Sequence, residues 1–285
     1  MELTLSAPAK LNLFLDITGK RNDGYHLIST VMQSVDLCDE VTVIIEDNDL
    51  PITIECTDKD IPTDERNTAH KAARLFMEHI GKPACGVSIK IKKVIPSQAG
   101  MAGGSTDAAA VLKALNILTG ASLPMETLCD IAEKVGADVP FCLYGGTMKA
   151  GGIGTELSPL PDMPGCIFVV AKPDVRVSTP EAYRLSDERG YDFTASPDRV
   201  INGIYSGSIE ETAKGLYNKF EDVLRLPEIE EIKSMMLSCG ALGALMTGSG
   251  SAVFGIFTDR PSAEKCFAGL SGICTAFISQ CCHAG

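Results

Sequence analysis

Several features that would place this chain of 285 residues in a membrane, secreted or metal-binding class are missing. No apolar run reaches the length of about 20 residues that a membrane-spanning helix needs. Residues 1–8 have neither the basic start nor the apolar core of a signal peptide. No Cys-x-x-Cys pair occurs among the eleven cysteines, which argues against a disulfide framework or a zinc site. We therefore expect a cytoplasmic globular protein with reduced thiols and no membrane partner.

Clustered positive charge is also missing. The chain has 25 Lys and Arg against 37 Asp and Glu, which gives a net charge of −12. Because binding to a nucleic acid backbone needs clustered Lys and Arg, the composition argues against a nucleic acid partner. Because the overall electrostatic field repels an anion, any phosphate must be held by helix ends, loop amides and individual lysines.

The apolar patterns alternate between strand and helix periods. The first residues predict two strands joined near Pro8–Lys10, and residues 41–45 and 52–56 predict two more. Helices are predicted over 67–79, 105–118, 124–135, 208–216, 227–237 and 261–270, and strands over 87–91, 167–171, 242–247, 252–257 and 273–279. This order favours an α+β fold of layered sheets and helices.

A stretch rich in glycine and proline separates the two halves of the chain. It runs from residue 145 to 165 and is predicted to be a linker. The domain boundary is therefore expected near residue 155. The prediction is an N-terminal ATP-binding and catalytic domain over residues 1–155 and a C-terminal substrate-binding domain over residues 156–285.

The most informative segment is a glycine-rich loop between a predicted strand and a predicted helix. It reads Pro-Ser-Gln-Ala-Gly-Met-Ala-Gly-Gly-Ser-Thr over residues 96–106. It matches neither the Walker loop nor the dinucleotide-binding fingerprint. One interpretation is a tight turn whose glycines serve backbone shape alone. The other is a phosphate site, because glycine allows close approach and a helix N-terminus offers unpaired N–H groups.

Two charged residues are candidates for catalysis. Lys10 enters an apolar alternating strand, where it is either an edge lysine that reaches solvent or a cation beside an anionic centre. Asp138 lies in Gly-Ala-Asp-Val-Pro-Phe, where it either caps the next helix or accepts the proton of a substrate hydroxyl.

Two further segments are candidates for ligand binding. Residues 247–251 read Thr-Gly-Ser-Gly-Ser between two predicted strands, which fits a hairpin turn or a second anion-binding nest. Tyr25 and His26 follow an Asp-Gly turn. They either stack on a flat base or simply pack against the protein.

Together these segments resemble the superfamily of galactokinase, homoserine kinase, mevalonate kinase and phosphomevalonate kinase (the GHMP kinases). The glycine loop carries the likeness to the superfamily. Pro8–Leu15, Asp23–His26, Gly136–Phe141 and Thr247–Gly250 resemble the branch that phosphorylates the 2-hydroxyl of 4-(cytidine 5'-diphospho)-2-C-methyl-D-erythritol in non-mevalonate isoprenoid biosynthesis. The motifs run in order from residue 8 to 250, which is nearly the whole chain.

The resemblance implies a fold and a set of roles. The N-terminal domain would resemble domain 2 of ribosomal protein S5, and the C-terminal domain would be ferredoxin-like. Lys10 and Asp138 would pair as the catalytic residues. The ATP site would consist of Pro96, Ser97, Gln98, Ala99, Gly100, Met101, Ala102, Gly103, Gly104, Ser105 and Thr106. The substrate site would consist of Asn12, Tyr25, His26, Thr179, Tyr183, Gly248 and Ser249.

The resemblance also implies partners and leaves alternatives. ATP and a divalent metal such as Mg²⁺ are expected, with no metal ligand assigned, and the protein is expected to be a monomer or weak homodimer. Ala102 stands where many relatives have glycine, so a positive φ there would be strained. Asp107 is expected to complement the helix dipole. A sister small-molecule kinase of the superfamily or a non-catalytic ligand sensor are the alternatives.

Overall fold

The chain divides into two compact units in the computed structural model, which describes residues 1–46, 48, 50–83, 86–191 and 195–283. Unit 1 comprises Met1–Ala9, Leu37–Ser97 and Ala102–Tyr144, and unit 2 comprises Lys10–Asp36, Gln98–Met101 and Gly145–Gly285. Two long strands, β1 (Glu2–Lys20) and β2 (His26–Ile45), contribute residues to both units. The predicted functional division at residue 155 stays a prediction.

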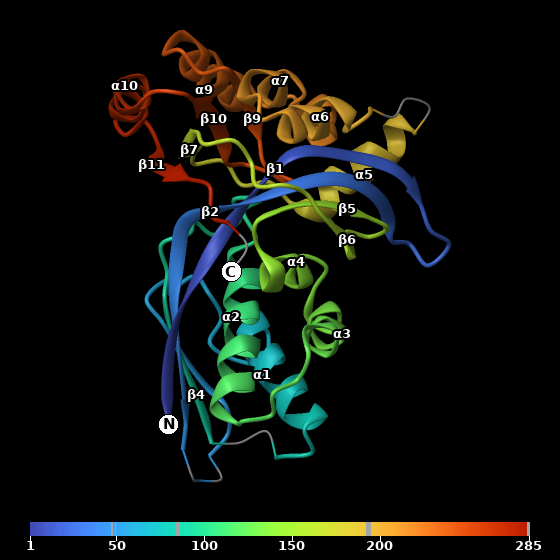
Figure 1. Cartoon of the computed structure of the whole chain (residues 1–285), viewed down its shortest axis with the longest axis vertical. Helices are drawn as coiled ribbons and strands as arrows, with labels where there is room; N and C mark the ends of the chain where they lie inside the picture. The colour runs from blue at the N-terminus through green and yellow to red at the C-terminus, as the bar shows by residue number, and fades with distance from the viewer. Residues whose placement is uncertain (47, 49, 84–85, 192–194, 284–285) are drawn as a thin grey trace. The chain divides into compact units, whose positions relative to one another are not determined.

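Unit 1 combines a sheet with four helices. In its sheet, β4 (Val87–Lys92) pairs in parallel with β3 (Thr53–Cys56) and antiparallel with β2. Apolar residues alternate along β4, so one of its faces is buried and the other meets water. The helices α1 (Thr68–His79), α2 (Gly103–Leu118), α3 (Met125–Val135) and α4 (Val139–Tyr144) lie on one side of these strands (Figure 1).

The sequence explains the limits of the two central helices of unit 1. The side chain of Asn67 caps α1 by accepting the N–H of Ala69 at 2.8 Å. Helix α2 buries Ala108, Val111, Leu112 and Leu115, which share one face at helical spacing. It ends before Gly120, whose φ of +66° favours glycine.

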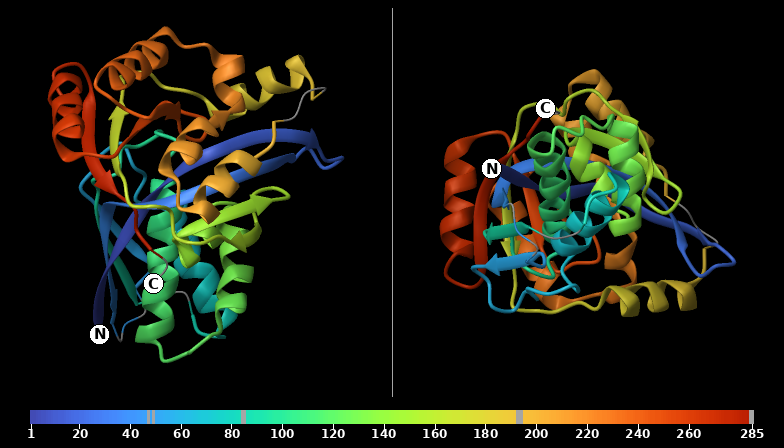
Figure 2. Two further views of the ribbon diagram at one scale, coloured as in Figure 1. Left: turned by 45° about the horizontal axis from the view of Figure 1, so that its top comes forward. Right: turned by 90° about the horizontal axis from the view of Figure 1, so that it is seen from below.

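Unit 2 contains a four-stranded antiparallel sheet in the order β11-β7-β10-β9. These strands are β11 (Thr275–Gln280), β7 (Ile167–Lys172), β10 (Val253–Phe257) and β9 (Gly243–Met246). Helices α9 (Pro227–Ser238) and α10 (Arg260–Leu270) pack on one face of it, over Val169, Ala171, Val253 and Phe257 (Figure 2). Burial of this apolar face fixes the helices on the sheet.

The remaining elements of unit 2 surround the long strands. A hairpin of β5 (Thr147–Gly151) and β6 (Glu156–Pro159) pairs with β2, and β8 (Tyr217–Asn218) pairs in parallel with β1. Four helices complete the unit: α5 (Thr179–Arg189), α6 (Asp198–Ser206), α7 (Ile209–Lys214) and α8 (Lys219–Leu224).

The α+β class and the predicted helices and strands after residue 67 are confirmed, with ends that differ by a few residues. The predicted strand break at Pro8–Lys10 is wrong, because β1 runs through it without interruption. Strand β8 pairs with β1 only at Phe14 and Leu15, so Pro8 lies on a strand edge that needs no N–H donor.

The predicted linker over residues 145–165 is also wrong, because it contains the β5–β6 hairpin. Gly152 and Gly154, both with positive φ, supply its turn rather than a flexible connection. In the described part of the chain, every cysteine is a free thiol, and no helix has the length and apolar character to cross a bilayer.

Candidate active site

The glycine-rich segment leads from the end of β4 into α2, which confirms the predicted order of strand, loop and helix. Ala102 is the N-cap residue of α2, and its φ of 59° lies in the left-handed region, so the strain expected at this position is present. No side chain caps the helix. The first N–H groups of a helix that lacks a side-chain cap can bind an anion.

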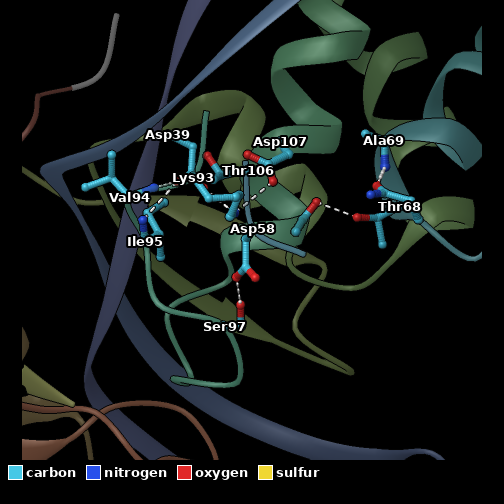
Figure 3. Close-up of polar contacts among 12 residues, drawn as sticks. Asp39, Asp58, Thr68, Ala69, Lys93, Val94, Ile95, Ser97, Thr106 and Asp107 are labelled. Carbon is cyan, nitrogen blue, oxygen red and sulfur yellow. Dashed lines mark hydrogen bonds and ion pairs between the residues drawn. The ribbon is translucent and has the colours of Figure 1, made fainter. Parts of the chain in front are cut away.

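Side chains of unit 1 fix the start of this segment. Oδ1 of Asp39 accepts the N–H groups of Val94 at 2.6 Å and Ile95 at 2.9 Å. The hydroxyl of Ser97 donates to Oδ2 of Asp58 at 2.8 Å. These bonds hold the backbone directly before and at the beginning of the loop (Figure 3).

Two threonines fix the first turn of α2. Thr68 on α1 donates to the carbonyl oxygen of Gly104 at 2.6 Å, and Thr106 donates to that of Pro8 at 2.8 Å. The hydroxyl of Thr106 is therefore already used within unit 1. The peptide N–H of Thr106 bonds to the carbonyl of Ala102 at 2.9 Å, so the helix begins there.

Beneath the loop, a lysine binds two carboxylates. The ammonium of Lys93 donates to Asp39 and, at 2.9 Å, to Asp107, and all three side chains are at most 5% exposed. Burial raises the pKa of Asp107 to about 7, against the lowering effect of Lys93. The expected dipole role of Asp107 is wrong, because this residue lies beyond the first turn and binds Lys93 instead.

In unit 2 the middle of the glycine-rich segment meets Lys10. The Lys10 side chain is only 4% exposed, so the interpretation as an edge lysine in solvent is wrong. Its ammonium donates to the carbonyl of Gly100 at 2.9 Å and to Oδ1 of Asn12. Two oxygen acceptors offset part of the cost of burying the charge.

The hairpin turn after β9 approaches the same segment. Thr247 donates to the carbonyl of Gly100 at 3.4 Å, and a Cβ built on Gly100 would lie 2.1 Å from the Thr247 oxygen. Gly248 is equally close, because its Cβ would lie 2.6 Å from the Gly100 oxygen. Glycine is therefore required on both sides of this contact, and the predicted hairpin is confirmed.

Asn12 joins the strand to this turn. Its N–H donates to the hydroxyl of Thr247 at 2.9 Å, and its Nδ2 donates to Thr30 at 2.8 Å. Asn218 supports the turn from the other side, since its Nδ2 donates to the carbonyls of Met246 at 2.6 Å and Gly248 at 2.8 Å. The structure adds Thr30 and Asn218 to the residues predicted from the sequence.

A second group in unit 2 contains the predicted base-binding residues. The rings of His26 and Tyr183 stack with centroids 4.3 Å apart. Nε2 of His26 bonds to Oδ1 of Asp187 at 2.7 Å, and Lys20 donates to Oδ2 at 2.5 Å. Hydrogen bonds from Lys20, Tyr191 and His26 outweigh the effect of burial and hold the pKa of Asp187 well below its usual value.

Three residues at helical spacing on α5 contribute to these contacts. Thr179 bonds to Ser249 at 2.8 Å, Tyr183 stacks on His26, and Asp187 binds His26. Positions separated by four residues lie on one helix face. This spacing was the signal that could have identified Asp187, which the sequence prediction missed because α5 was not recognised.

Tyr25 and Asp138 are the remaining predicted residues. Tyr25 is 58% exposed, and its N–H bonds to Asp23 at 3.3 Å. Asp138 belongs to unit 1 and precedes α4, where its carbonyl accepts the N–H of Cys142 at 3.2 Å. This position is consistent with a helix start. The pairing of Asp138 with Lys10, which belongs to unit 2, stays a prediction.

Among the described residues, no group of three or more His, Cys, Asp or Glu side chains could hold a metal ion. A metal cage built from protein alone does not fit this part of the chain. Mg²⁺ bound by nucleotide phosphates and water needs few protein ligands and is compatible with it.

Comparisons with known proteins agree on the class of this fold. Residues 67–146 match the family described as GHMP kinases N terminal domain, and residues 201–274 match GHMP kinases C terminal. The fold is therefore the two-domain GHMP kinase fold, as the resemblance implied.

Individual relatives narrow the likeness further. The chain is 43% identical over 267 residues to a 4-diphosphocytidyl-2-C-methyl-D-erythritol kinase from Clostridium botulinum, which covers 93% of this chain and 94% of that protein. A solved 4-(cytidine 5'-diphospho)-2C-methyl-D-erythritol kinase superposes with a TM-score of 0.82 at 33% identity, covering 99% and 100% of the two chains. A homoserine kinase from Cytophaga hutchinsonii, at 20% identity and a TM-score of 0.78 over 99% and 95%, shares the fold.

Proposed function

Since the chain belongs to the family of 4-diphosphocytidyl-2-C-methyl-D-erythritol kinases, we propose that it phosphorylates the 2-hydroxyl of 4-(cytidine 5'-diphospho)-2-C-methyl-D-erythritol with ATP. This reaction belongs to non-mevalonate isoprenoid biosynthesis. The observation that carries the proposal is the buried ammonium of Lys10, bound to Gly100 of the glycine-rich segment. Burial of a cation in an apolar strand costs free energy. Such a cation is suited to a reaction centre where it can stabilise the negative charge of phosphate groups.

The phosphates of ATP bind at residues 96–106 in this proposal. The N–H groups at the start of α2 face them. The absence of a side-chain cap on α2 supports this role. With a net charge of −12, the chain depends on such local donors to attract a polyanion.

The transfer itself follows from two side chains. Asp138 accepts the proton of the substrate's 2-hydroxyl. The oxygen of this hydroxyl attacks the γ-phosphorus of ATP, and the bond between that phosphorus and the bridging oxygen that leaves with ADP breaks. Lys10 stabilises the negative charge that develops on the attacking oxygen. Mg²⁺ on the nucleotide would neutralise phosphate charge, and no side chain is assigned to it.

The stacked rings of His26 and Tyr183 in unit 2 are assigned to the cytidine moiety of the substrate. His26 bonds to the base, Tyr25 and Tyr183 stack on it, and Thr179, Gly248 and Ser249 face the diphosphate. Asn12 contacts the polar chain of the acceptor. Substrates of the mevalonate and homoserine kinases carry no base, so His26 and Tyr183, already stacked at 4.3 Å, favour the nucleotide-linked substrate.

ADP release measured with and without the diphosphocytidyl substrate tests the function. We expect turnover to depend on this substrate, with mevalonate and homoserine as inactive controls. Binding of both ligands without ADP release would support the non-catalytic alternative. A state of monomer or weak homodimer, a cytoplasmic location and Mg²⁺ as the metal remain predictions.

A further inference from the structure

Asp39, Lys93 and Asp107 of unit 1, here called the buried triad, have no assigned role in the reaction. Their side chains are at most 5% exposed, and they carry one positive and two negative charges when ionised. A buried ion pair gives little net stability, because removal of charges from water offsets their attraction. In addition, Oδ1 of Asp107 has no hydrogen-bond partner in the described part of the chain. Stability alone therefore does not explain the buried triad.

The first link of the triad is to the entrance of the phosphate loop. Asp39 accepts the N–H groups of Val94 and Ile95, at 2.6 and 2.9 Å, through one oxygen. The next residue, Pro96, has no N–H to donate. Val94 and Ile95 are therefore the last residues before the loop whose N–H groups can donate, and Asp39 accepts both.

The second link is to the helix at the exit of the loop. A Cβ built on Gly103 would lie 3.1 Å from Nζ of Lys93, so the ammonium lies directly against the first residue of α2. Asp107 binds this ammonium at 2.9 Å from one turn further along. Figure 3 shows Lys93 between Asp39 and Asp107, with Val94 and Ile95 beside Asp39.

We propose that Asp39, Lys93 and Asp107 are positioning residues that hold both ends of the phosphate loop, so that the N–H groups of Gly103–Ser105 are oriented toward the phosphates of ATP. The proposal rests on the proposed function, since it takes residues 96–106 as the ATP site. The residues touch neither ligand, and they act through the backbone of the loop.

Hydrogen exchange of the unligated protein tests the positioning role without any nucleotide. In Asp39→Ala we expect faster exchange of the amides of residues 94, 95, 97 and 102–106, because two N–H acceptor contacts are lost. Asp39→Asn keeps an oxygen acceptor and should restore most of the protection. Asp16→Asn is the matched control, because it also alters a buried carboxylate that accepts backbone N–H groups, at Ile17 and Ala195.

Calorimetric titration with ATP, and separately with cytidine diphosphate, tests the consequence for binding. Asp39→Ala should weaken ATP binding about tenfold and leave cytidine diphosphate binding unchanged.

Two results would overturn the proposal. These are unchanged exchange in Asp39→Ala, and an equal loss of affinity for both nucleotides. If the wild type binds no ATP, the proposed function fails, and the exchange measurement still decides whether the triad orders the loop.

Discussion

Lys10 is a residue whose burial costs folding free energy and whose charge has a role in the proposed reaction. Its charge is buried in β1, a strand whose neighbouring side chains Leu11 and Leu13 are fully buried. Gly100 and Asn12 provide oxygen acceptors, which make burial tolerable. In the proposed reaction, the same low-dielectric surroundings would strengthen the attraction between its ammonium and the negative charge that develops on the attacking oxygen.

Asp138→Asn is expected to reduce turnover by about 100- to 10,000-fold, because an amide cannot accept the proton of the substrate hydroxyl. The affinities for ATP and for the diphosphocytidyl substrate should stay close to those of the wild type. Steady-state kinetics together with binding titrations measure the two effects separately. A parallel loss of both affinities would instead assign Asp138 to the structure of the turn before α4.

Asp187→Asn is expected to raise KM for the diphosphocytidyl substrate about tenfold and leave KM for ATP unchanged, because His26 loses its charged partner at 2.7 Å. Glu188→Gln on the same helix is the control, since its side chain is 60% exposed and pairs with Arg184. An unchanged KM for the substrate in Asp187→Asn would remove His26 from the proposed base site.

At the scale of elements, two glycine turns of unit 2 pack closely against each other. The segment 98–101 and the turn after β9 contact one another through Gly100 and Gly248, and neither position has space for a Cβ. This contact explains why both turns contain glycine. A requirement for close packing, in addition to the requirement for positive φ, distinguishes them from ordinary loop glycines.

Gly100→Ala is expected to lower the free energy of unfolding more than Gly81→Ala or Gly120→Ala does. All three glycines have φ between +66° and +72°, but only a Cβ at Gly100 would clash, at 2.1 Å from the Thr247 oxygen. The controls should lose about 1–2 kcal/mol for the left-handed conformation alone. Urea unfolding of the three variants measures the difference, and equal losses would show that the contact with Thr247 relaxes freely.

At the scale of the whole molecule, buried acids set the pH dependence of stability. Burial raises the pKa of Asp16, Asp107 and Glu221. A raised pKa in the folded state means that the acid favours folding at low pH and loses this contribution as the pH rises. For Asp107 the loss falls between its ordinary pKa of about 4 and the folded value of about 7.

The unfolding free energy of the wild type, relative to Asp107→Asn, is therefore expected to fall as the pH rises from 4 to 7. The slope is at most about 1.4 kcal/mol per pH unit for one proton. Urea unfolding of both proteins at several pH values gives this difference directly, since titration of other groups is common to both. A difference that rises with pH would mean that the pairing of Asp107 with Lys93 outweighs burial.

Many of the candidate site residues could be named from local patterns. The glycine-rich segment, Lys10, Asp138 and the turn at residues 247–251 were identified from residue type and spacing, and the helices after residue 67 from their periodicity. Helix α5 was missed because its charged residues obscure an apolar face. With it, the shared face of Thr179, Tyr183 and Asp187 was missed.

By itself the sequence predicted most helices and strands after residue 67 and a phosphate site at the glycine-rich loop, because periodicity, glycine and helix ends act over a few residues. Only the tertiary structure decided that Lys10 is buried, that Asp39 and Asp107 share Lys93, and that Asp187 holds His26. These contacts join residues that are between 14 and 161 positions apart. Burial and pairing depend on which side chains the fold brings together, and no local pattern carries that information.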